Sequence, residues 1–437
     1  MTNESSVILE RIRRAHRQDI NLSLRPAYTN LLAALGNPQD QLTNVIHVAG
    51  TNGKGSTCAF LRAMCEASGK TVNVYTSPHL VHFHERIRIC GKLIEEDELA
   101  SLLQEIEDKA EKGGISYFEA GTAAALTAFA RHKADVTLLE VGLGGRLDAT
   151  NVVDTPCVDI ITRLSFDHRD YLGDTMDAIA REKAAIMRTR VPCITAPQPS
   201  VEALAALRDE STKCQTPLSV GGDDWRIEAV DEEFFRFLGT TRKIEKLPRP
   251  ALVGTHQLWN AGLAIMAAQE LPFSLSDEDI RKAMKQVIWP GRLQQLKKGS
   301  FASKLPENWE LWIDGGHNDS AGEALAAQMN RWKTQDNKPL HVIFGMLSTK
   351  KPEEFLDPIK HFINSVSTVH ITDEMACFSA EELAKATTAI GIEKSHPQTS
   401  FDQALNNLID TSQNPSRILA CGLLYLAGLI PRENKSF

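Results

Sequence analysis

Residues 45–56 read Val-Ile-His-Val-Ala-Gly-Thr-Asn-Gly-Lys-Gly-Ser, and this stretch decides the fold. Residues 45–49 form an apolar run typical of a buried strand, and a helical pattern runs from residue 57 to about residue 68, where Gly69 ends it. A glycine-rich loop between a strand and a helix can wrap its backbone around an anion, which the helix N-terminus also attracts. The stretch therefore predicts a phosphate-binding strand, loop and helix.

Two side chains of this loop suit a nucleotide. Lys54 supplies a positive charge for β- and γ-phosphates, and Ser56 supplies a hydroxyl placed like the magnesium ligand of a P-loop. The match is imperfect because Gly55 separates the two, and a glycine-rich turn that binds nothing is the alternative. The sequence Asn-Lys-Pro-Leu at 337–340 lacks the aspartate of a guanine-reading motif, which favours ATP over GTP. The predicted ATP contacts here are Gly50, Thr51, Asn52, Gly53, Lys54, Gly55 and Ser56.

Strands that alternate with helices along the first part of the chain predict an α/β fold with a mostly parallel, doubly wound sheet. The expected strands are 71–75, 136–141 and 158–162, and the expected helices are 96–112, 119–132, 256–270 and 276–286. After about residue 195, short alternating segments at 225–230 and 234–238 predict an antiparallel hairpin insertion.

The alternation restarts after Trp-Pro-Gly-Arg at 289–292, where we place a domain boundary. The prediction is a domain of residues 1–292 and a smaller Rossmann-like α/β domain of residues 293–437. Ser379 and Glu382 form a capping box, and the apolar run 418–430 is interpreted as a buried strand. The other strands expected here are 309–313, 340–344 and 368–371, with helices at 320–332, 353–363 and 403–409.

Composition limits the classes of protein. The chain has 437 residues, 42% of them hydrophobic, and its 48 Lys and Arg against 56 Asp and Glu give a net charge of −8. That charge argues against a nucleic-acid partner. The eight cysteines include no C-x-x-C pair and are interpreted as reduced thiols in the cytoplasm. Charged residues interrupt every apolar stretch of residues 1–19, so we expect no signal peptide, and the longest apolar run, 418–430, is shorter than a membrane span requires.

Acidic and basic side chains follow the expected strands. Glu140 ends an apolar strand, and a carboxylate at the carboxyl end of a parallel strand can hold magnesium. A solvated strand-end glutamate is the alternative. Asp167 and His168 follow the next strand, and Lys183 comes 15 residues after His168 in a helical segment. Composition and spacing do not decide whether this histidine and lysine are functional.

Six motifs then stand together in order: HVAGTNGKGST, TSPHL with HERIRI, LLEVGLGGRLDATN, DHRDYLGDT with REKAAIMR, WPGRLQ and IDGGHN. Over the chain from about residue 20, this combination resembles folylpolyglutamate synthase and bifunctional dihydrofolate synthase of the Mur ligase superfamily. The resemblance implies ligation of L-glutamate to dihydropteroate, to reduced folates, or to both. ATP would activate the acceptor carboxylate as an acyl phosphate and leave as ADP.

The resemblance also implies two Mg²⁺ sites. Ser56, Ser77 and Glu140 resemble the ligands of the first, and His168, Glu140 and Lys183 resemble those of the second. In relatives this lysine is carbamylated, which turns a cation into an oxygen ligand. An ordinary ion-paired helix lysine is the alternative. The implied catalytic residues are Lys54, Glu140, His168 and Lys183.

Further residues are implied at the two ends of the substrates. Asn260, Arg292, Asp314 and His317 look like nucleotide contacts, so the second domain would complete the ATP and glutamate site. The acceptor site resembles the region formed by Ser77, Pro78, His79, Arg86, Phe118 and Asp148. For each acceptor residue, a role in the core or in a turn is the alternative.

Alternatives and departures remain open at this point. A muramyl ligase is disfavoured because the loop begins at residue 50 and leaves no room for a preceding sugar-nucleotide domain. A catalytically silent nucleotide binder is disfavoured because Lys54, Glu140, His168 and Lys183 are all present. Lys351 and Asp319 depart from residues frequent in relatives, which leaves the detailed contacts there undecided. The resemblance implies a monomer.

Overall fold

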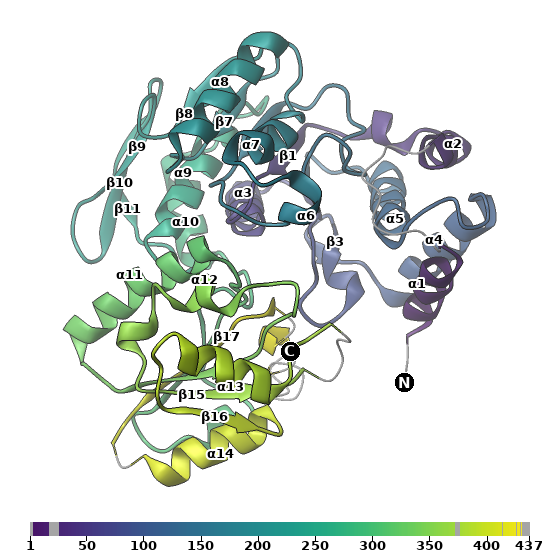
Figure 1. Cartoon of the computed structure of the whole chain (residues 1–437). Coiled ribbons are helices and arrows are strands. Elements are labelled where there is room, and N and C mark those ends of the chain that lie inside the picture. The colour runs from purple at the N-terminus through teal and green to yellow at the C-terminus, as the bar shows by residue number, and fades with distance from the viewer. Residues whose placement is uncertain are drawn as a thin grey trace. The chain divides into compact units, whose positions relative to one another are not determined.

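The computed structural model describes residues 3–16, 26–371, 376–412, 414–424, 426–428 and 430. The chain forms two compact units (Figure 1). The first comprises Met1–Ala251 and Leu258–Val287, and the second comprises Leu252–Gln257 and Ile288–Phe437. The second unit thus begins a few residues before the boundary that we placed after Arg292, and it also takes in a short earlier segment.

The first unit is built on an eight-stranded sheet with the order β4-β3-β2-β5-β1-β6-β7-β8. Every neighbouring pair from β2 to β8 is parallel, and only β3 and β4 pair antiparallel at one edge. The predicted α/β class with a mostly parallel sheet is therefore confirmed. The strands are β1 (Val45–Ala49), β2 (Val72–Tyr75), β3 (Ile87–Ile89), β4 (Lys92–Leu93), β5 (Val136–Glu140), β6 (Val158–Ile161), β7 (Cys193–Thr195) and β8 (Leu218–Val220).

Helices cover both faces of this sheet. Val45 and Ala49 of β1 share one face and belong to the apolar clusters that α5 (Tyr117–Arg131), α7 (Met176–Ala184) and α8 (Val201–Cys214) complete. Helix α3 (Lys54–Ala67) joins β1 to β2, and a right-handed crossover puts it on the opposite face, where it packs with α10. The remaining helices are α1 (Glu4–Ala15), α2 (Pro26–Ala34), α4 (Glu96–Lys109), α6 (Arg169–Leu172), α9 (His256–Ala268) and α10 (Asp277–Gln286), with 3₁₀ turns at Pro38–Gln41 and Phe83–Arg86.

The predicted hairpin insertion is present and has a third strand. Strands β9 (Arg226–Ala229), β10 (Phe234–Leu238) and β11 (Lys243–Pro248) form a separate antiparallel sheet, which is drawn at the left of Figure 1. Phe235 and Phe237 are fully buried and alternate with half-buried neighbours. This alternation is the pattern of a strand with one covered face.

The second unit has a six-stranded sheet with the order β12-β13-β17-β14-β15-β16, parallel except for β12. Its predicted capping box is present, because Ser379 and Glu382 bond each other's backbone at the start of α13. The strands are β12 (Gln294–Leu296), β13 (Glu310–Ile313), β14 (Leu340–Phe344), β15 (Ser365–Val369), β16 (Ser395–Gln398) and β17 (Arg417–Cys421). The helices are α11 (Asp319–Gln335), α12 (Pro352–Leu356), α13 (Ala380–Ala389) and α14 (Phe401–Thr411), with 3₁₀ turns at Ala302–Lys304 and Lys360–Phe362.

Some predicted boundaries are wrong. The strand predicted over 418–430 ends at Cys421, and the described residues from Leu424 to Ile430 are helical. An apolar run alone does not distinguish a buried strand from a buried helix. Helix α3 begins at Lys54 rather than at residue 57, because Gly53 takes a left-handed conformation (φ 96°) that lets the helix start directly after it.

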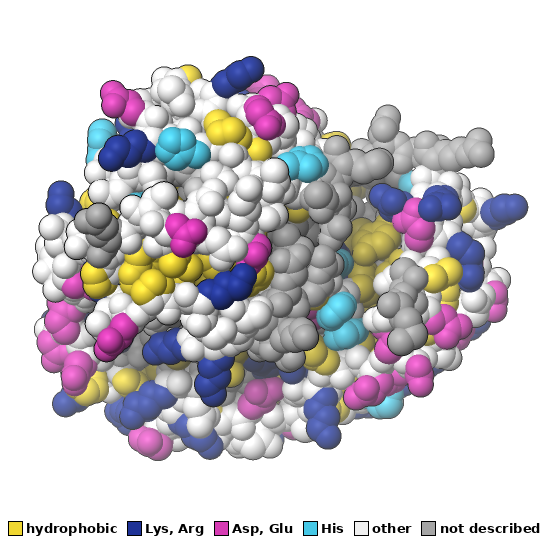
Figure 2. All heavy atoms as spheres, turned by 90° about the horizontal axis from the view of Figure 1, so that it is seen from below, with side chains coloured by type: hydrophobic (Ala, Val, Ile, Leu, Met, Phe, Trp, Pro, Cys, Tyr) yellow, Lys and Arg dark blue, Asp and Glu magenta, His cyan; other side chains and the backbone are white. Residues whose placement is uncertain are grey.

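The described helices and one face of the molecule can be compared with what a membrane span or a charged binding surface requires. No helix in the described part of the chain is long and apolar enough to cross a membrane. On the face shown in Figure 2, Lys and Arg side chains are interspersed with Asp and Glu side chains. That face therefore carries no broad surface of one charge.

Candidate active site

The glycine-rich loop is held by backbone contacts with the segment after β6. The amides of Thr51 and Asn52 both donate to the carbonyl of Arg163, and the Thr51 hydroxyl donates to the carbonyl of Ser165. A Cβ at Gly50 would lie 1.9 Å from the Thr162 hydroxyl, so only glycine fits there. The loop is thus fixed against a neighbouring strand end before the helix begins.

Two lysines lie on this loop. The ammonium of Lys54 donates to the carbonyls of Gly50 and Thr51, at 3.1 and 3.2 Å. The ammonium of Lys183, from α7, donates to the same Gly50 carbonyl at 3.0 Å. Lys183 is buried, and burial, followed by the charge of Lys54, lowers its pKa from 10.5 to about 7. A substantial neutral fraction of this amine is therefore present near neutral pH.

Glu140 lies next to the loop strand. It ends β5, and the strand register places it beside Val48 of β1, two residues before the loop. Its side chain is buried, and its carboxylate accepts the amide of Ser77 at 3.1 Å. Ser56 is also buried, in the first turn of α3. Strand ends that meet at one edge of the sheet thus carry a carboxylate and hydroxyl groups, the donors that hard cations prefer.

His168 is placed differently from these groups. It takes a left-handed conformation (φ 50°) at the start of α6, its side chain is 44% exposed, and its amide donates to Asp167. Asp167 also acts electrostatically on Lys183. Within the described residues, no three side chains of His, Cys, Asp or Glu are grouped closely enough to share a metal ion. The predicted metal ligands therefore depend on serine hydroxyls and on Lys183 as well.

Asn260 lies against the loop although it is about 200 residues away in the sequence. It is a buried residue of α9, and a Cβ at Gly53 would lie 2.5 Å from its Oδ1 atom. Both residues belong to the first unit. The predicted nucleotide contact and the predicted phosphate loop are thus brought together.

Three other predicted nucleotide contacts lie together in the second unit. Asp314 follows β13, and its carboxylate accepts the amides of Leu293 and Gly316. Burial raises the pKa of Asp314, and the charge of Arg292 opposes that rise. A Cβ at Gly315 would lie 2.5 Å from a guanidinium nitrogen of Arg292, and His317 Nδ1 lies 3.2 Å from the Gly315 carbonyl.

Residues predicted for the acceptor form two neighbouring groups in the first unit. Arg86 is buried and donates from Nε to His79 Nδ1 at 3.0 Å. Burial, followed by the charge of Arg86, lowers the pKa of His79 to about 3, so this histidine is neutral. His79 follows Ser77 and Pro78, and a cis peptide bond joins those two residues.

The second group centres on Phe118, which is half-buried. Its ring centroid lies 6.1 Å from that of Tyr75, and a Cβ at Gly142 would lie 2.3 Å from its Cζ atom. The Asp148 carboxylate is buried and accepts four hydrogen bonds, from the amides of Gly142 and Leu143 and from the amide and hydroxyl of Thr150. Asp148 thus organises this loop, in line with the turn role that was the alternative for each acceptor residue.

The two departures from relatives lie at the surface of the second unit or at a helix end. Lys351 is exposed and donates to Glu354 three residues later. Asp319 begins α11, where its carboxylate accepts the amide of Ser320. Neither contact involves Arg292, Asp314 or His317.

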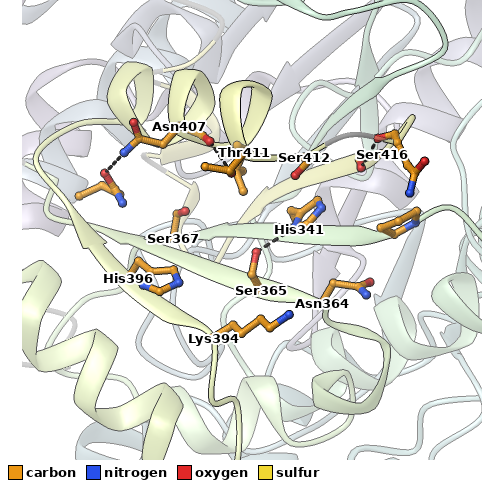
Figure 3. Close-up of a pocket in the computed structure, with 14 residues that line it drawn as sticks. His341, Asn364, Ser365, Ser367, Lys394, His396, Asn407, Thr411, Ser412 and Ser416 are labelled. Carbon is orange, nitrogen blue, oxygen red and sulfur yellow. Dashed lines mark hydrogen bonds between the residues drawn. The ribbon is translucent and has the colours of Figure 1, made fainter.

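A polar cavity of about 580 Å³ in the second unit is separate from the predicted site (Figure 3). Its lining includes Asn364, Lys394 and Ser416, each of which directly precedes a strand. Asp314 directly follows a strand that is parallel to these. The cavity therefore lies at the amino ends of the parallel strands, and the predicted nucleotide contact Asp314 lies at their carboxyl ends.

Known families match both units. Residues 48–268 match the Mur ligase middle domain, and residues 297–432 match the dihydrofolate synthetase C-terminal domain. With the glycine-rich loop, its two lysines and Glu140, these matches define an ATP-dependent acid–amino-acid ligase of the Mur type.

Curated relatives and solved structures identify the family within that class. Dihydrofolate synthase/folylpolyglutamate synthase of Bacillus subtilis (strain 168) is 37% identical over 77% of this chain and 79% of its own length. The enzyme of that name from Escherichia coli (strain K12) is 32% identical over 93% of this chain and 90% of its own length. The chain belongs to the dihydrofolate synthase/folylpolyglutamate synthase family.

The solved structures agree along the whole chain. E. coli FolC in complex with DHPP and ADP has a TM-score of 0.87 and 29% identity, and the match covers 100% of this chain and 98% of that one. The bifunctional synthase of Yersinia pestis complexed with AMPPNP and Mn ion has a TM-score of 0.85 and 27% identity, over 99% and 98% of the two chains.

Proposed function

We propose that this ligase joins L-glutamate to dihydropteroate, to reduced folates, or to both, in the cytoplasm and as a monomer. The observation that carries the proposal is the pair of ammonium groups, of Lys54 and Lys183, on the Gly50 carbonyl of the glycine-rich loop. Lys54 supplies a half-buried positive charge that suits a phosphate, and Lys183 supplies a buried amine with a lowered pKa.

ATP would be held from two sides. The loop amides, the N-terminus of α3 and Lys54 suit the phosphates, and Asn260 lies against the same loop. Arg292, Asp314 and His317 of the second unit suit the rest of the nucleotide, with the planar guanidinium for a phosphate and the carboxylate for a ribose hydroxyl.

The reaction has two steps. An oxygen of the acceptor carboxylate attacks the γ-phosphorus of ATP, the bond to ADP breaks, and an acyl phosphate forms. The glutamate amine then attacks the acyl carbon, phosphate leaves and the amine loses a proton, which gives the amide. Lys54 and the loop amides stabilise the charge on the transferring phosphoryl group.

The predicted metal donors fit Mg²⁺. Buried Glu140 with the hydroxyls of Ser56 and Ser77 suits one hard cation, and Glu140 with His168 and Lys183 suits a second. A bound divalent ion would neutralise phosphate charge there. Lys183 becomes an oxygen ligand if its neutral amine adds CO₂, forming one N–C bond and releasing one proton. Burial and the lowered pKa favour that addition.

The acceptor would bind among Ser77, Pro78, His79, Arg86, Phe118 and Asp148. The Phe118 ring offers a stacking surface for a pterin, and Arg86 offers a charge for a carboxylate. Asp148 keeps its predicted role at this end, through the loop that its four hydrogen bonds organise.

The decisive assay measures ADP release with ATP, Mg²⁺ and L-glutamate, with either dihydropteroate or tetrahydrofolate as the acceptor. Turnover with one or both acceptors defines which activity is present. A protein that binds ATP but shows no glutamate-dependent ADP release with either acceptor would be the silent nucleotide binder instead, and the proposal would be overturned.

A further inference from the structure

A buried histidine outside the predicted site contacts the loop that carries Asp148. His47 is the middle residue of β1, is 1% exposed, and places its Nε2 atom 2.9 Å from the hydroxyl of Thr150. Thr150 is itself fully buried and lies 103 residues further along the chain. Each hydrogen bond has one donor and one acceptor, so the direction of the bonds in this buried pair can be worked out from the groups around it.

The direction starts at Asp148. Its Oδ2 atom accepts the amides of Gly142 and Leu143, and its Oδ1 atom accepts the amide of Thr150. Both oxygens thus act as acceptors, and the Thr150 hydroxyl donates its single proton to Oδ1 at 2.6 Å. That hydroxyl oxygen can then only accept from His47, whose Nε2 atom must carry the proton.

The environment of His47 agrees with one proton on the ring. Burial, followed by the charge of Arg188, lowers the pKa of His47 to about 3. The imidazole is therefore neutral, and protonation at Nε2 leaves Nδ1 without a hydrogen. The result is a one-way chain of hydrogen bonds from His47 through Thr150 to Asp148.

The chain ends at the surface on which Phe118 rests. Gly142, held by Asp148, is so close to the ring that a Cβ would lie 2.3 Å from Cζ and 2.7 Å from Cε2 of Phe118. The Tyr75 ring also lies near the Phe118 ring, with centroids 6.1 Å apart, and the Tyr75 hydroxyl accepts from the hydroxyl of Thr122 at 3.2 Å. A shift of Asp148 would therefore move the turn at 142–143 and release the ring.

We propose that His47 is a positioning residue for the folate-type acceptor: through Thr150 and Asp148 it fixes the 142–143 turn that supports Phe118. This rests on the proposed function, because Phe118 matters only if the acceptor binds there. Since β1 also leads into the phosphate loop, His47 ties the acceptor end of the site to the strand that carries the nucleotide end.

The first test reads the tautomer in the purified wild-type protein. Nitrogen-15 NMR of the histidine rings is expected to show His47 protonated at Nε2 and bare at Nδ1, unchanged between about pH 6 and pH 8 because its pKa lies far below. Thr150→Val removes the hydroxyl and is expected to shift the Nε2 resonance. A proton on Nδ1, or titration of His47 in this range, would overturn the proposal without bearing on the ligase activity.

The second test separates positioning from simple packing. His47→Met and Thr150→Val are each expected to raise KM for dihydropteroate about tenfold, the effect of one lost hydrogen bond, while KM for ATP changes less than about twofold. His47→Gln keeps an N–H near the Nε2 position and Thr150→Ser keeps the hydroxyl, so both should restore most of the acceptor affinity.

Three results would contradict the positioning role of His47 or the proposed function. Equal rises in both KM values, or an unchanged acceptor KM in a folded Thr150→Val protein, would show that the pair is only structural. If His47→Met does not fold, the KM values of Thr150→Val and the tautomer of His47 in the wild type test the positioning role instead. A wild-type protein without glutamate-dependent ADP release would refute the proposed function and leave the tautomer result standing.

Discussion

The ammonium of Lys183 lies 3.0 Å from the carbonyl oxygen of Gly50, inside the first unit and beside the phosphate loop. With a pKa of about 7, the buried Lys183 side chain is about half in its neutral amine form at pH 7. This contact places a reactive amine next to the carbonyl that Lys54 also contacts.

Replacing Lys183 tests its role in the reaction. Lys183→Met is expected to lower glutamate-dependent ADP release about 100-fold, as loss of a group that supports a metal does. Lys213→Met is the matched control, because that lysine is exposed and pairs with Asp209 and Glu210 at the surface of α8. Intact-mass measurement in bicarbonate buffer should show one added CO₂ on the wild type and none on Lys183→Met. Full activity of the variant would contradict the role.

The same lysine predicts a pH dependence of stability. Between about pH 7 and pH 9 the folded protein has released the Lys183 proton, whereas the unfolded chain, with an ordinary pKa of 10.5, keeps it. The unfolded state then binds more protons, so the free energy of unfolding of the wild type rises with pH relative to Lys183→Met. The rise is at most about 1.4 kcal/mol per pH unit. Urea unfolding of both proteins in CO₂-free buffer measures it, and parallel pH curves would refute it.

Asp159 predicts a pH dependence of the free energy of unfolding that has the opposite sign to that of Lys183. It lies on β6 opposite His47, it is fully buried, and neither carboxylate oxygen has a hydrogen-bond partner within the described structure. Burial raises its pKa to about 8. Between about pH 4 and pH 8 the folded state therefore binds more protons than the unfolded state, and this contribution to stability falls as pH rises.

Asp159→Asn removes that titration. At pH 7 the variant is expected to be more stable than the wild type by about 1 to 3 kcal/mol, and the difference should shrink toward pH 4. Thermal unfolding across this range is the measurement. The stability difference between the variant and the wild type is compared at pH 7 and at pH 4. If the variant loses stability relative to the wild type on going from pH 4 to pH 7, Asp159 is ionised and paired in the folded protein.

Substitution of Gly142 tests whether its contact with the Phe118 ring matters for binding of the acceptor. Gly142→Ala adds a methyl group that would lie 2.3 Å from the Phe118 Cζ atom, so the ring must move. We expect KM for the acceptor to rise about tenfold and KM for ATP to stay within about twofold. Phe118→Leu in the same background removes the clash, so the double variant should lose no more affinity than Phe118→Leu alone. Additive losses would show that the two residues act independently.

Local patterns predicted the parts of the site that lie at strand ends. Glu140 ends an apolar strand and Asp314 directly follows one, and the glycines at 50, 53 and 55 mark a loop between a strand and a helix. Position in the sequence therefore already indicates position at the carboxyl ends of the strands. The fold class could be predicted for the same reason, because strands and helices alternate with clear periods.

Other features could not be predicted because their partners are far apart in the sequence. Nothing near His47 in the sequence indicates that it bonds Thr150. No side-chain pattern indicates that Asp148 accepts the backbone amides of the 142–143 turn, and its role toward the acceptor stays a prediction. Helix α8 was missed because its buried positions, such as Ala203 and Ala206, are small and give a weak apolar stripe. These contacts are fixed by tertiary structure.

The chain leaves the first unit and returns to it, which limits where a fragment containing that unit can end. Asn260 touches the phosphate loop at Gly53, yet it is reached only after the segment Leu252–Gln257 has left for the second unit. A fragment cut after residue 251 would keep every strand of the main sheet and lose both α9 and α10, which pack on that unit. The first unit is therefore discontinuous along the chain, and cleavage at the junction near residue 288 would release all of its residues together with the segment Leu252–Gln257 of the second unit.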